Sequence, residues 1–129
     1  MSARTILVAD EDIDTRIILR TVLERIDFIV VEAANADDAM EAARVCDPHL
    51  IILNYPMADR TGATLVQRLR TLPTTQRVPI LNLTSRVTQK FLDDAHREGV
   101  AVSIPKPIDV ARIVVVVGEL TGRTLAMAR

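Results

Sequence analysis

Five short apolar runs alternate with five amphipathic segments along this chain, and this alternation constrains its fold more than any other feature. The runs cover residues 5–9, 28–32, 49–54, 78–84 and 100–104. They are too apolar to leave one face in water, as expected of strands that are covered on both faces of a parallel sheet. Strand–helix alternation of this kind predicts an α/β domain with helices on both faces and right-handed crossovers.

The segments between these runs carry apolar residues at helical spacing. Asn35 is a predicted N-cap, the Asp47-Pro48 pair ends the same helix, and Gly99 is a predicted C-cap. The other expected helices span residues 14–26, a segment that begins at residue 62, residues 88–98 and about 109–120. The first helix carries Ile18, Val22 and Ile26 at helical spacing, with Leu19 and Leu23 beside them.

Length and composition indicate one globular domain. The chain has 129 residues, and we expect a domain over residues 1–121 and a frayed tail over 122–129. A net charge of -1 without a basic block gives no indication of nucleic-acid binding. Cys46 is the single cysteine, so no intrachain disulfide can form, and no signal peptide or membrane span is visible. A reducing, cytoplasmic location is therefore expected.

Polar side chains gather where the predicted strands end. Parallel strands place their carboxyl ends at one edge of the sheet, which is where open α/β sheets bind ligands. The residues expected at this edge are Asp10, Glu11, Asn54, Thr84, Ser85 and Lys106. Each has an ordinary structural alternative, because an acidic pair can cap a helix, a threonine can simply end a strand, and a lysine can occupy a solvated turn. Their convergence from separate strands favours a functional site.

This pattern resembles the receiver domain of two-component response regulators, from Ile6 to about Leu120. In that family an acidic pair follows the first strand, a phosphoacceptor aspartate ends the third, a threonine or serine ends the fourth, and a Lys-Pro pair follows the fifth. The matching positions here are Asp10-Glu11, Asn54, Thr84 and Lys106-Pro107, with Met57 and Gly62 at the family's spacing after the acceptor position. The chain departs from the pattern at Asn54 itself and at Ala58, where the family has proline.

The resemblance implies a single doubly wound (βα)5 flavodoxin-like domain with a parallel five-stranded sheet in the order 2-1-3-4-5. It also implies a switch in which a sensor histidine kinase supplies a phosphoryl group. In the family's arrangement Mg²⁺ would be held by Asp10, Glu11 and the backbone carbonyl of Pro56, and the phosphoryl oxygens would be contacted by Thr84, Ser85 and Lys106. These residue types suit that chemistry, because hard cations prefer oxygen ligands and fixed positive charge stabilises a transferring phosphoryl group.

Asn54 changes what can be expected of this site. The family's acceptor is a carboxylate because its oxygen forms the acyl phosphate, and an amide is a very poor substitute. We therefore expect no ordinary phosphorylation at Asn54, and weak or absent Mg²⁺ binding. Two explanations stay open: a naturally divergent receiver, or an ordinary phosphoacceptor protein that carries a blocking Asp→Asn substitution. Transfer to Thr84 or Ser85 is a third route.

The resemblance also implies a conformational switch at Thr84 and at a position in the last strand. The family has an aromatic residue three positions before the lysine that follows the fifth strand. Here that lysine is Lys106, and the position three before it holds Ser103. The acceptor aspartate and the aromatic switch residue of the family are thus both replaced here, by Asn54 and Ser103. This favours a module whose conformation is fixed, or is controlled by something other than phosphate.

The last predicted helix contains four consecutive valines, and its expected inward stripe consists of Val110, Ile113, Val114 and Val117. That stripe leaves Val115 and Val116 pointing elsewhere. They could belong to a broad core face, since consecutive β-branched residues are poor helix formers. Alternatively they form an exposed apolar patch used for pairing. In the family the fourth helix, fifth strand and fifth helix often form the dimer or partner surface, so a homodimer through these elements is one expectation.

Three functions remain after these observations. The preferred one is a stand-alone receiver-like module, not an enzyme, that binds a protein partner and is not phosphorylated. It is expected to lack an output domain, because the chain ends soon after the fifth helix. The second is an ordinary Mg²⁺-dependent response regulator in blocked form. The third is a phosphatase-like enzyme with Asp10 as nucleophile, which is disfavoured because Asp12 is its sole candidate second acid.

Overall fold

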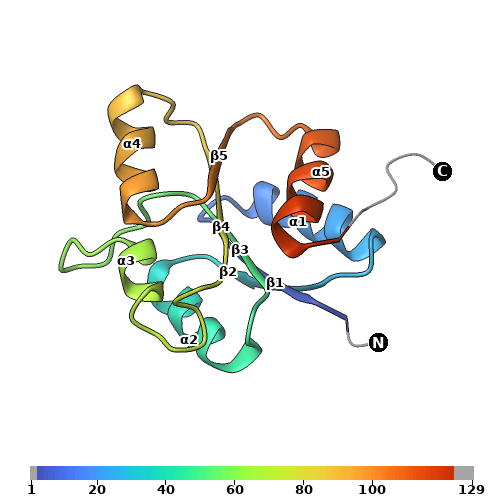
Figure 1. Ribbon diagram of the computed structural model, residues 1–129, viewed down its shortest axis with the longest axis horizontal. Coiled ribbons are helices and arrows are strands. Elements are labelled where there is room, and N and C mark those ends of the chain that lie inside the picture. Colours follow the sequence, from blue (N-terminus) through green and yellow to red (C-terminus); the bar gives the residue numbers. More distant parts are fainter. Residues whose placement is uncertain (1–2, 124–129) are drawn as a thin grey trace.

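The computed structural model describes residues 3–123, and its central layer is a five-stranded parallel sheet (Figure 1). The strand order is β2-β1-β3-β4-β5, which confirms the predicted doubly wound flavodoxin-like fold. The strands are β1 (Thr5–Ala9), β2 (Ile29–Ala33), β3 (Leu50–Leu53), β4 (Ile80–Thr84) and β5 (Val102–Pro105). Because β1, β3 and β4 are inside the sheet and covered on both faces, their runs are mostly apolar, and the polar residues Asn82 and Thr84 of β4 are fully buried.

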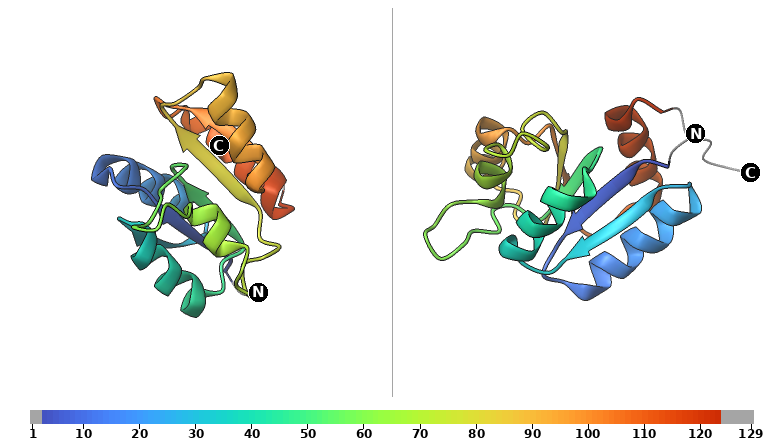
Figure 2. Two further views of the ribbon diagram at one scale, coloured as in Figure 1. Left: turned by 90° about the vertical axis from the view of Figure 1, so that its left-hand side faces the viewer. Right: turned by 90° about the horizontal axis from the view of Figure 1, so that it is seen from below.

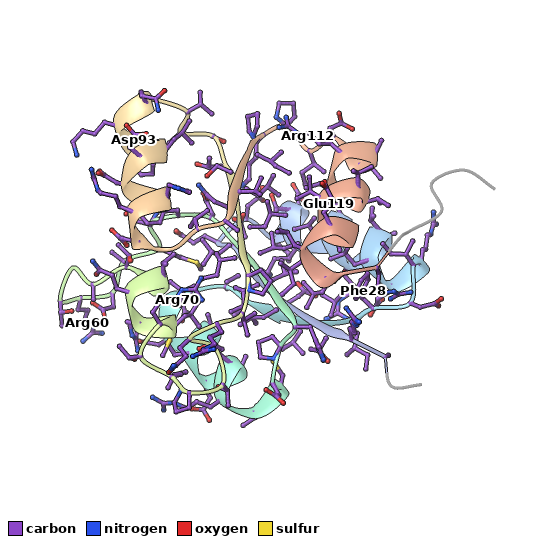
Figure 3. All side chains as sticks on the ribbon, in the orientation of Figure 1. Phe28, Arg60, Arg70, Asp93, Arg112 and Glu119 are labelled. Carbon is purple, nitrogen blue, oxygen red and sulfur yellow. The ribbon has the colours of Figure 1, made fainter. Side chains whose placement is uncertain are left out.

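Five helices form the outer layers of the domain (Figures 1 and 2). They are α1 (Ile13–Arg25), α2 (Ala36–Cys46), α3 (Leu65–Leu69), α4 (Gln89–Glu98) and α5 (Val110–Thr121). Residues of α2, α3 and α4 pack in one buried cluster with one face of the sheet, and residues of α1 and α5 pack in a second cluster with the other face. The sheet therefore has a core on each side, and side chains fill both layers (Figure 3).

Local chemistry explains where several helices begin and end. The Asn35 side chain accepts the N–H of Asp38 at 2.8 Å and caps α2, and Asp47 ends that helix in the left-handed region. Gly99 ends α4 with φ +118°. These three signals are where the sequence predicted them. Residues 124–129, most of the predicted tail, lie outside the described residues, and α5 ends at Thr121.

The third helix starts later than predicted, at Leu65 instead of Gly62. The Asp59 carboxylate accepts the N–H groups of Thr61 and Ala63, which holds these residues in a turn, and Gly62 lies there with φ +87°. Thr64 then caps the helix through a reciprocal hydrogen-bond pair with Gln67. The helix is one turn shorter than expected because this loop uses the preceding residues.

Strand β4 also starts later than predicted, at Ile80 instead of Val78. Arg70 explains the difference, since its guanidinium donates to the carbonyls of Thr75 at 3.0 Å, Val78 at 2.8 Å and Gly99 at 2.7 Å. Burial lowers the pKa of Arg70 below its usual value. This side chain fastens the connection before β4 to the end of α4, so residues 75–78 bond to it and not to a neighbouring strand.

Two predicted apolar stripes are only partly buried. In α1 the buried residues are Thr15, Leu19 and Leu23, whereas Ile18 is 41% exposed. In α5 Val110 is 45% exposed, while Ile113, Val114 and Val117 are buried as predicted. Apolar residues occupy more than one face of each helix, so spacing alone does not decide which face meets the sheet.

Candidate functional site

The predicted site residues lie at the carboxyl edge of the sheet, where the strand ladder continues for one residue beyond the strands. The Asn54 N–H donates to the Ala9 carbonyl at 3.2 Å, and the Lys106 N–H donates to the Thr84 carbonyl at 2.8 Å. Asp10 follows β1 directly, and its N–H donates to the Ala33 carbonyl of β2. These backbone bonds join the end of β1 to those of β2 and β3, and the end of β5 to that of β4, and they set the positions of the side chains that follow.

Asp10 and Lys106 are brought into direct contact although 96 positions separate them in the chain. Lys106 Nζ lies 3.0 Å from Asp10 Oδ2, and the side chains are 17% and 4% exposed. The other oxygen of Asp10 accepts the N–H of Asp12 at 2.9 Å. A nearly buried carboxylate requires such partners, because burying it alone is costly. The ion pair joins the loops after β1 and β5.

Glu11 differs from its neighbour in that its side chain is exposed. The loop that carries it is held by Arg16, whose Nη1 donates to the Asp10 carbonyl at 2.7 Å while its Nε bonds Glu32 at 3.1 Å. Glu11 also lines an open hollow of about 350 Å³ beside the site, together with Asn35, Pro56, Met57 and Arg86 among others.

The acidic pair Asp10-Glu11 does not cap α1, because a third acidic residue does so. Asp12 is the N-cap of α1, since its carboxylate accepts the Asp14 N–H at 3.1 Å and the Thr15 hydroxyl at 2.9 Å. The Thr15 hydroxyl is the main cause that holds the pKa of Asp12 below its usual range. The two preceding acids are therefore not required for capping.

Thr84 and Ser85 end β4 in different environments. Thr84 is fully buried, and its hydroxyl accepts the N–H of Arg86 at 2.9 Å. Ser85 is exposed. The Thr84 hydroxyl still has its own proton to donate, so it can bond an oxygen that enters the site.

The segment after β3 is closely held by its neighbours. Asn54 is partly buried, and the N–H of the next residue, Tyr55, donates to the side-chain oxygen of Asn82 at 3.0 Å. The Tyr55–Pro56 bond is cis, as is the Lys106–Pro107 bond. The Pro56 carbonyl accepts the N–H of Leu65 at 3.1 Å, which leaves one of its lone pairs for another partner.

The donor set suits Mg²⁺ in chemical type but lacks the third anion. Asp10, Glu11 and the Pro56 carbonyl offer hard oxygen atoms, and position 54 adds an amide where a carboxylate would complete the set. The Lys106 ammonium already neutralises Asp10 and would compete with a cation. Among residues 3–123 no group of three or more His, Cys, Asp or Glu side chains is arranged to hold a metal ion.

Asn82 lies in the interior of β4 and is fully buried, and it was not predicted from the sequence as a residue of the site. Its Nδ2 donates to Ser103 Oγ on β5 at 3.2 Å, so the predicted switch position Ser103 has a polar partner. The available signal was an amide placed inside an otherwise apolar run. A buried polar residue is more informative than an exposed apolar one, because it has to be paired.

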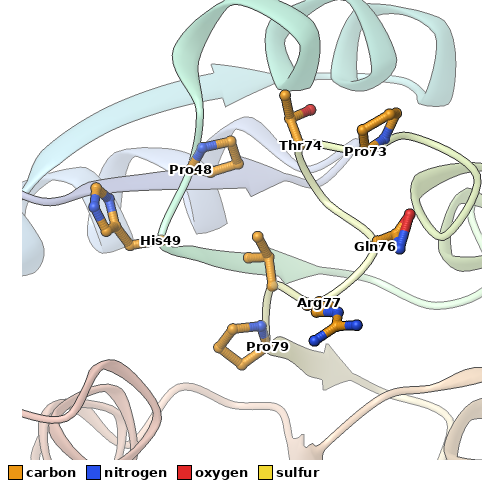
Figure 4. A pocket seen from close by; sticks show the side chains of 8 residues that line it. Pro48, His49, Pro73, Thr74, Gln76, Arg77 and Pro79 are labelled. Carbon is orange, nitrogen blue, oxygen red and sulfur yellow. The ribbon is translucent and has the colours of Figure 1, made fainter.

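A second hollow, of about 410 Å³, lies at the opposite edge of the sheet (Figure 4). Its lining comes from residues that precede β3 and β4: Pro48, His49, Pro73, Thr74, Gln76, Arg77, Val78 and Pro79. His49 Nδ1 accepts the Thr5 N–H at 3.2 Å, which gives this histidine a structural role. None of the predicted site residues lines this hollow.

This fold and edge arrangement define a doubly wound α/β domain with polar residues at the carboxyl edge of its sheet, and comparison with known proteins specifies its family. The family model for the response regulator receiver domain matches residues 6–118. The chain therefore belongs to the response regulator receiver domain family. Receiver domains are signalling modules of two-component systems. No helix among the described residues is long and apolar enough to cross a membrane.

The chain is similar to a protein of comparable length and to longer proteins of which it covers only a part. An uncharacterised 14.6 kDa protein in the sodA1 3' region of Leptolyngbya boryana is 33% identical over 109 residues, covering 84% of this chain and 83% of that protein. The transcriptional regulator NtrC of Rhizobium meliloti is 26% identical over 119 residues, which cover 92% of this chain and 24% of NtrC. The Escherichia coli regulator PhoB is 27% identical over 126 residues, covering 98% of this chain and 55% of PhoB.

Solved structures share the fold at low sequence identity. The chemotaxis protein CheY4 of Vibrio cholerae superposes with a TM-score of 0.84 at 21% identity, covering 92% of this chain and 99% of that one. A response regulator from Desulfuromonas acetoxidans gives a TM-score of 0.83 at 24% identity, covering 92% and 97%.

Proposed function

We propose that this chain is an atypical receiver module that does not accept a phosphoryl group at position 54 and acts through contacts with other proteins. One observation carries the proposal: an amide occupies the place where the family has its nucleophilic carboxylate, at the end of β3. An amide oxygen is too weak a nucleophile to form the acyl phosphate. The proposed partner is a sensor histidine kinase or another signalling protein of the cytoplasm.

A second candidate is an ordinary phosphoacceptor regulator that carries a blocking substitution at position 54. It is favoured by the other residues at the carboxyl edge, which include the Asp10–Lys106 ion pair and the buried Thr84 hydroxyl. Under this alternative, restoring a carboxylate would be sufficient to restore phosphorylation. A phosphatase-like activity has weaker support, because Asp10, the proposed nucleophile, is 2% exposed and paired with Lys106.

Mg²⁺ has a secondary role in the proposed function. Asp10, Glu11 and the Pro56 carbonyl would hold the ion, and its charge would attract phosphate oxygens to this edge of the sheet. We propose that binding is weak, because two carboxylates remain and Lys106 neutralises one of them. The proposed module therefore works without a metal-dependent step.

The decisive experiment is incubation of the protein and of Asn54→Asp with acetyl phosphate and Mg²⁺, read by intact mass. The parent should show no adduct, and Asn54→Asp should show one. Asn54→Ala is the matched control, because it lacks both amide and carboxylate. An adduct on the parent would overturn the proposal, and peptide mapping with a Thr84→Val variant would show whether a hydroxyl received it. If neither protein reacts, more than the acceptor has been lost.

A further inference from the structure

Strand β2 is an edge of the sheet, with β1 as its single neighbour in the described part of the chain (Figure 2). The Ile29 N–H and the Ala33 carbonyl form backbone hydrogen bonds of 2.9 and 3.0 Å with residues that flank β1. Backbone groups alternate in direction along a strand, so the N–H and carbonyl groups of Val30 and Glu32 point away from β1. No strand of residues 3–123 lies on that side. These groups therefore face outward and are available to another strand.

The β2 edge lacks features that keep edge strands from pairing. Such strands are often protected by a proline, a bulge or a free charge. β2 contains no proline, and its five residues pair with β1 in unbroken register from Ile29 to Ala33. Its charged residue, Glu32, is bound by Arg20 Nε at 2.6 Å and by Arg16 Nε at 3.1 Å, both from α1. The charge of Glu32 is thus neutralised within the chain and does not repel a second strand.

One face of β2 is apolar along its whole length. Val31 and Ala33 pack in the buried cluster that contains α2. Because successive side chains of a strand point to opposite faces, Ile29 shares that face, and it is 51% exposed. The other face carries Val30, which is buried in the cluster of α1 and α5, and Glu32. A strand that pairs with this edge therefore meets an apolar row on one face and a neutralised carboxylate on the other.

A second copy of β2 fits this edge in antiparallel orientation. With a twofold axis at Val31, that residue lies opposite its own copy, and Val30 lies opposite Glu32 of the second copy. Val30 and Glu32 then exchange both backbone hydrogen bonds of an antiparallel pair, whereas the two Val31 residues form a non-hydrogen-bonded pair. Like charges do not meet, because each Glu32 faces a valine. On the apolar face the exposed Ile29 lies opposite the small Ala33 of the second copy, so large and small side chains alternate across the pair.

We propose that this chain forms a symmetric homodimer through the β2 edge, in which the two sheets join into one continuous sheet. The partner is a second copy, because β2 is complementary to itself in backbone register, in side-chain size and in charge. This surface is distinct from α4, β5 and α5, and it does not include the carboxyl edge of the sheet. Pairing is therefore independent of the residue at position 54 and of whether the protein accepts a phosphoryl group.

The test is disulfide cross-linking at the proposed twofold axis, in a Cys46→Ser background that removes the native thiol. The Cα atoms of the two Val31 residues would lie about 4.5 Å apart, within the range that a disulfide spans. Val31→Cys should therefore give a covalent dimer on mild oxidation, read by the mass of the denatured, non-reduced chain. Ile29→Cys is the matched control, because Ile29 is 51% exposed on the same face. It would lie about 14 Å from its own copy, too far for a disulfide.

Equal cross-linking of the two cysteine variants, or no cross-link in Val31→Cys with a native circular dichroism spectrum, would overturn the proposal. Equilibrium sedimentation without cross-linking is the second measurement, and the parent should show a monomer–dimer equilibrium. Val31→Lys should raise the dimer dissociation constant at least about tenfold, because two ammonium groups meet at the axis. Val115→Glu should leave that constant unchanged.

A parent that is monomeric at every concentration, or a dimer that Val115→Glu dissociates and Val31→Lys does not, would contradict pairing through β2. Ile29→Cys and Val31→Cys keep the test decisive if Val31→Lys does not fold. No phosphodonor is used, so a parent that proves to be phosphorylated would contradict the proposed function without affecting this result.

Discussion

Lys106 Nζ lies 3.0 Å from Asp10 Oδ2, and this contact closes the site between the loops after β5 and β1. The pair is the most buried ion pair at the carboxyl edge, with Asp10 also bound to the Asp12 N–H. Its two members come from opposite ends of the chain, so it fastens the first strand to the last loop. The ion pair is therefore important for stability as well as for the electrostatics of position 54.

Removing the Lys106 ammonium should lower the stability of the domain. We expect Lys106→Met to lower the free energy of unfolding by about 3 kcal/mol, because Asp10 is left buried without its counter-charge. Urea unfolding measures the change. Lys90→Met is the control, since Lys90 pairs with Asp94 while 86% exposed and should cost less than about 1 kcal/mol. Equal losses in the two variants would contradict the assignment.

Mg²⁺ affinity should depend on the residue at position 54. We expect Asn54→Asp to bind Mg²⁺ at least about tenfold more tightly than the parent, equivalent to about 1.4 kcal/mol, because a third carboxylate completes the oxygen set. Tyr55 is the sole tyrosine and the chain has no tryptophan, so intrinsic fluorescence reports on the residue next to the site. Asn54→Ala serves as control, and an equal affinity in all three proteins would place the ion elsewhere.

Substitutions at Val115 and Val116 of α5 should differ in their effect on the free energy of unfolding. Val115 is 48% exposed, whereas Val116 packs against the α1 and α5 core. Val115→Glu should change stability by no more than about 0.5 kcal/mol, while Val116→Glu should cost at least about 1 kcal/mol. Thermal or urea unfolding separates them. The proposed homodimer through α4, β5 and α5 is then tested with Val115→Glu by equilibrium sedimentation, where an unchanged mass would exclude a role of this residue in pairing.

Ionisation of Glu32 should make the free energy of unfolding depend on pH in the acidic range. Hydrogen bonding from Arg20, at 2.6 Å, is the main cause that lowers the pKa of Glu32 below its usual value of 4.5, and Arg16 adds to it. A folded-state pKa below the unfolded one gives stability that is present above pH 4.5 and is lost as pH falls through the folded pKa.

Glu32→Gln should therefore be less stable than the parent by about 1 kcal/mol at neutral pH, with the difference vanishing in strong acid. Urea unfolding across the pH range gives this curve. Glu41→Gln is the control, because Glu41 is 73% exposed and lies 3.9 Å from Arg44. A difference that grows on acidification would show that the sign is wrong.

Arg70 should also contribute to the stability of the domain. Its guanidinium bonds the carbonyls of Thr75, Val78 and Gly99, so Arg70→Met should cost about 2 kcal/mol or more, the scale of buried groups that lose a charged donor. Arg44→Met is the matched control, because the Arg44 side chain on α2 is 58% exposed. Hydrogen exchange should show faster opening at residues 75–78 in the variant, and uniform exchange would argue against this local role.

The sequence was sufficient where the governing interactions are local or where one face of an element must be apolar. Asn35 and Gly99 end their helices through bonds within a turn, so their residue types predicted them. The five apolar runs predicted the sheet, because a strand covered on both faces cannot carry exposed polar groups. The polar residues after the strands were predicted to share one edge, and Asp10 and Lys106 meet there.

Only the tertiary structure decided which apolar face of α1 is buried and which partners Asn82 has. Ile18 and Leu19 are equally apolar, and packing against the sheet selects Leu19. Asn82 and Ser103 are 21 positions apart, and their contact exists because β4 and β5 pair in one register. The amino-acid sequence determined the layers and the chemistry available at position 54. The alignment of distant strands determined what that position touches, because such pairing depends on the whole fold and on no local signal.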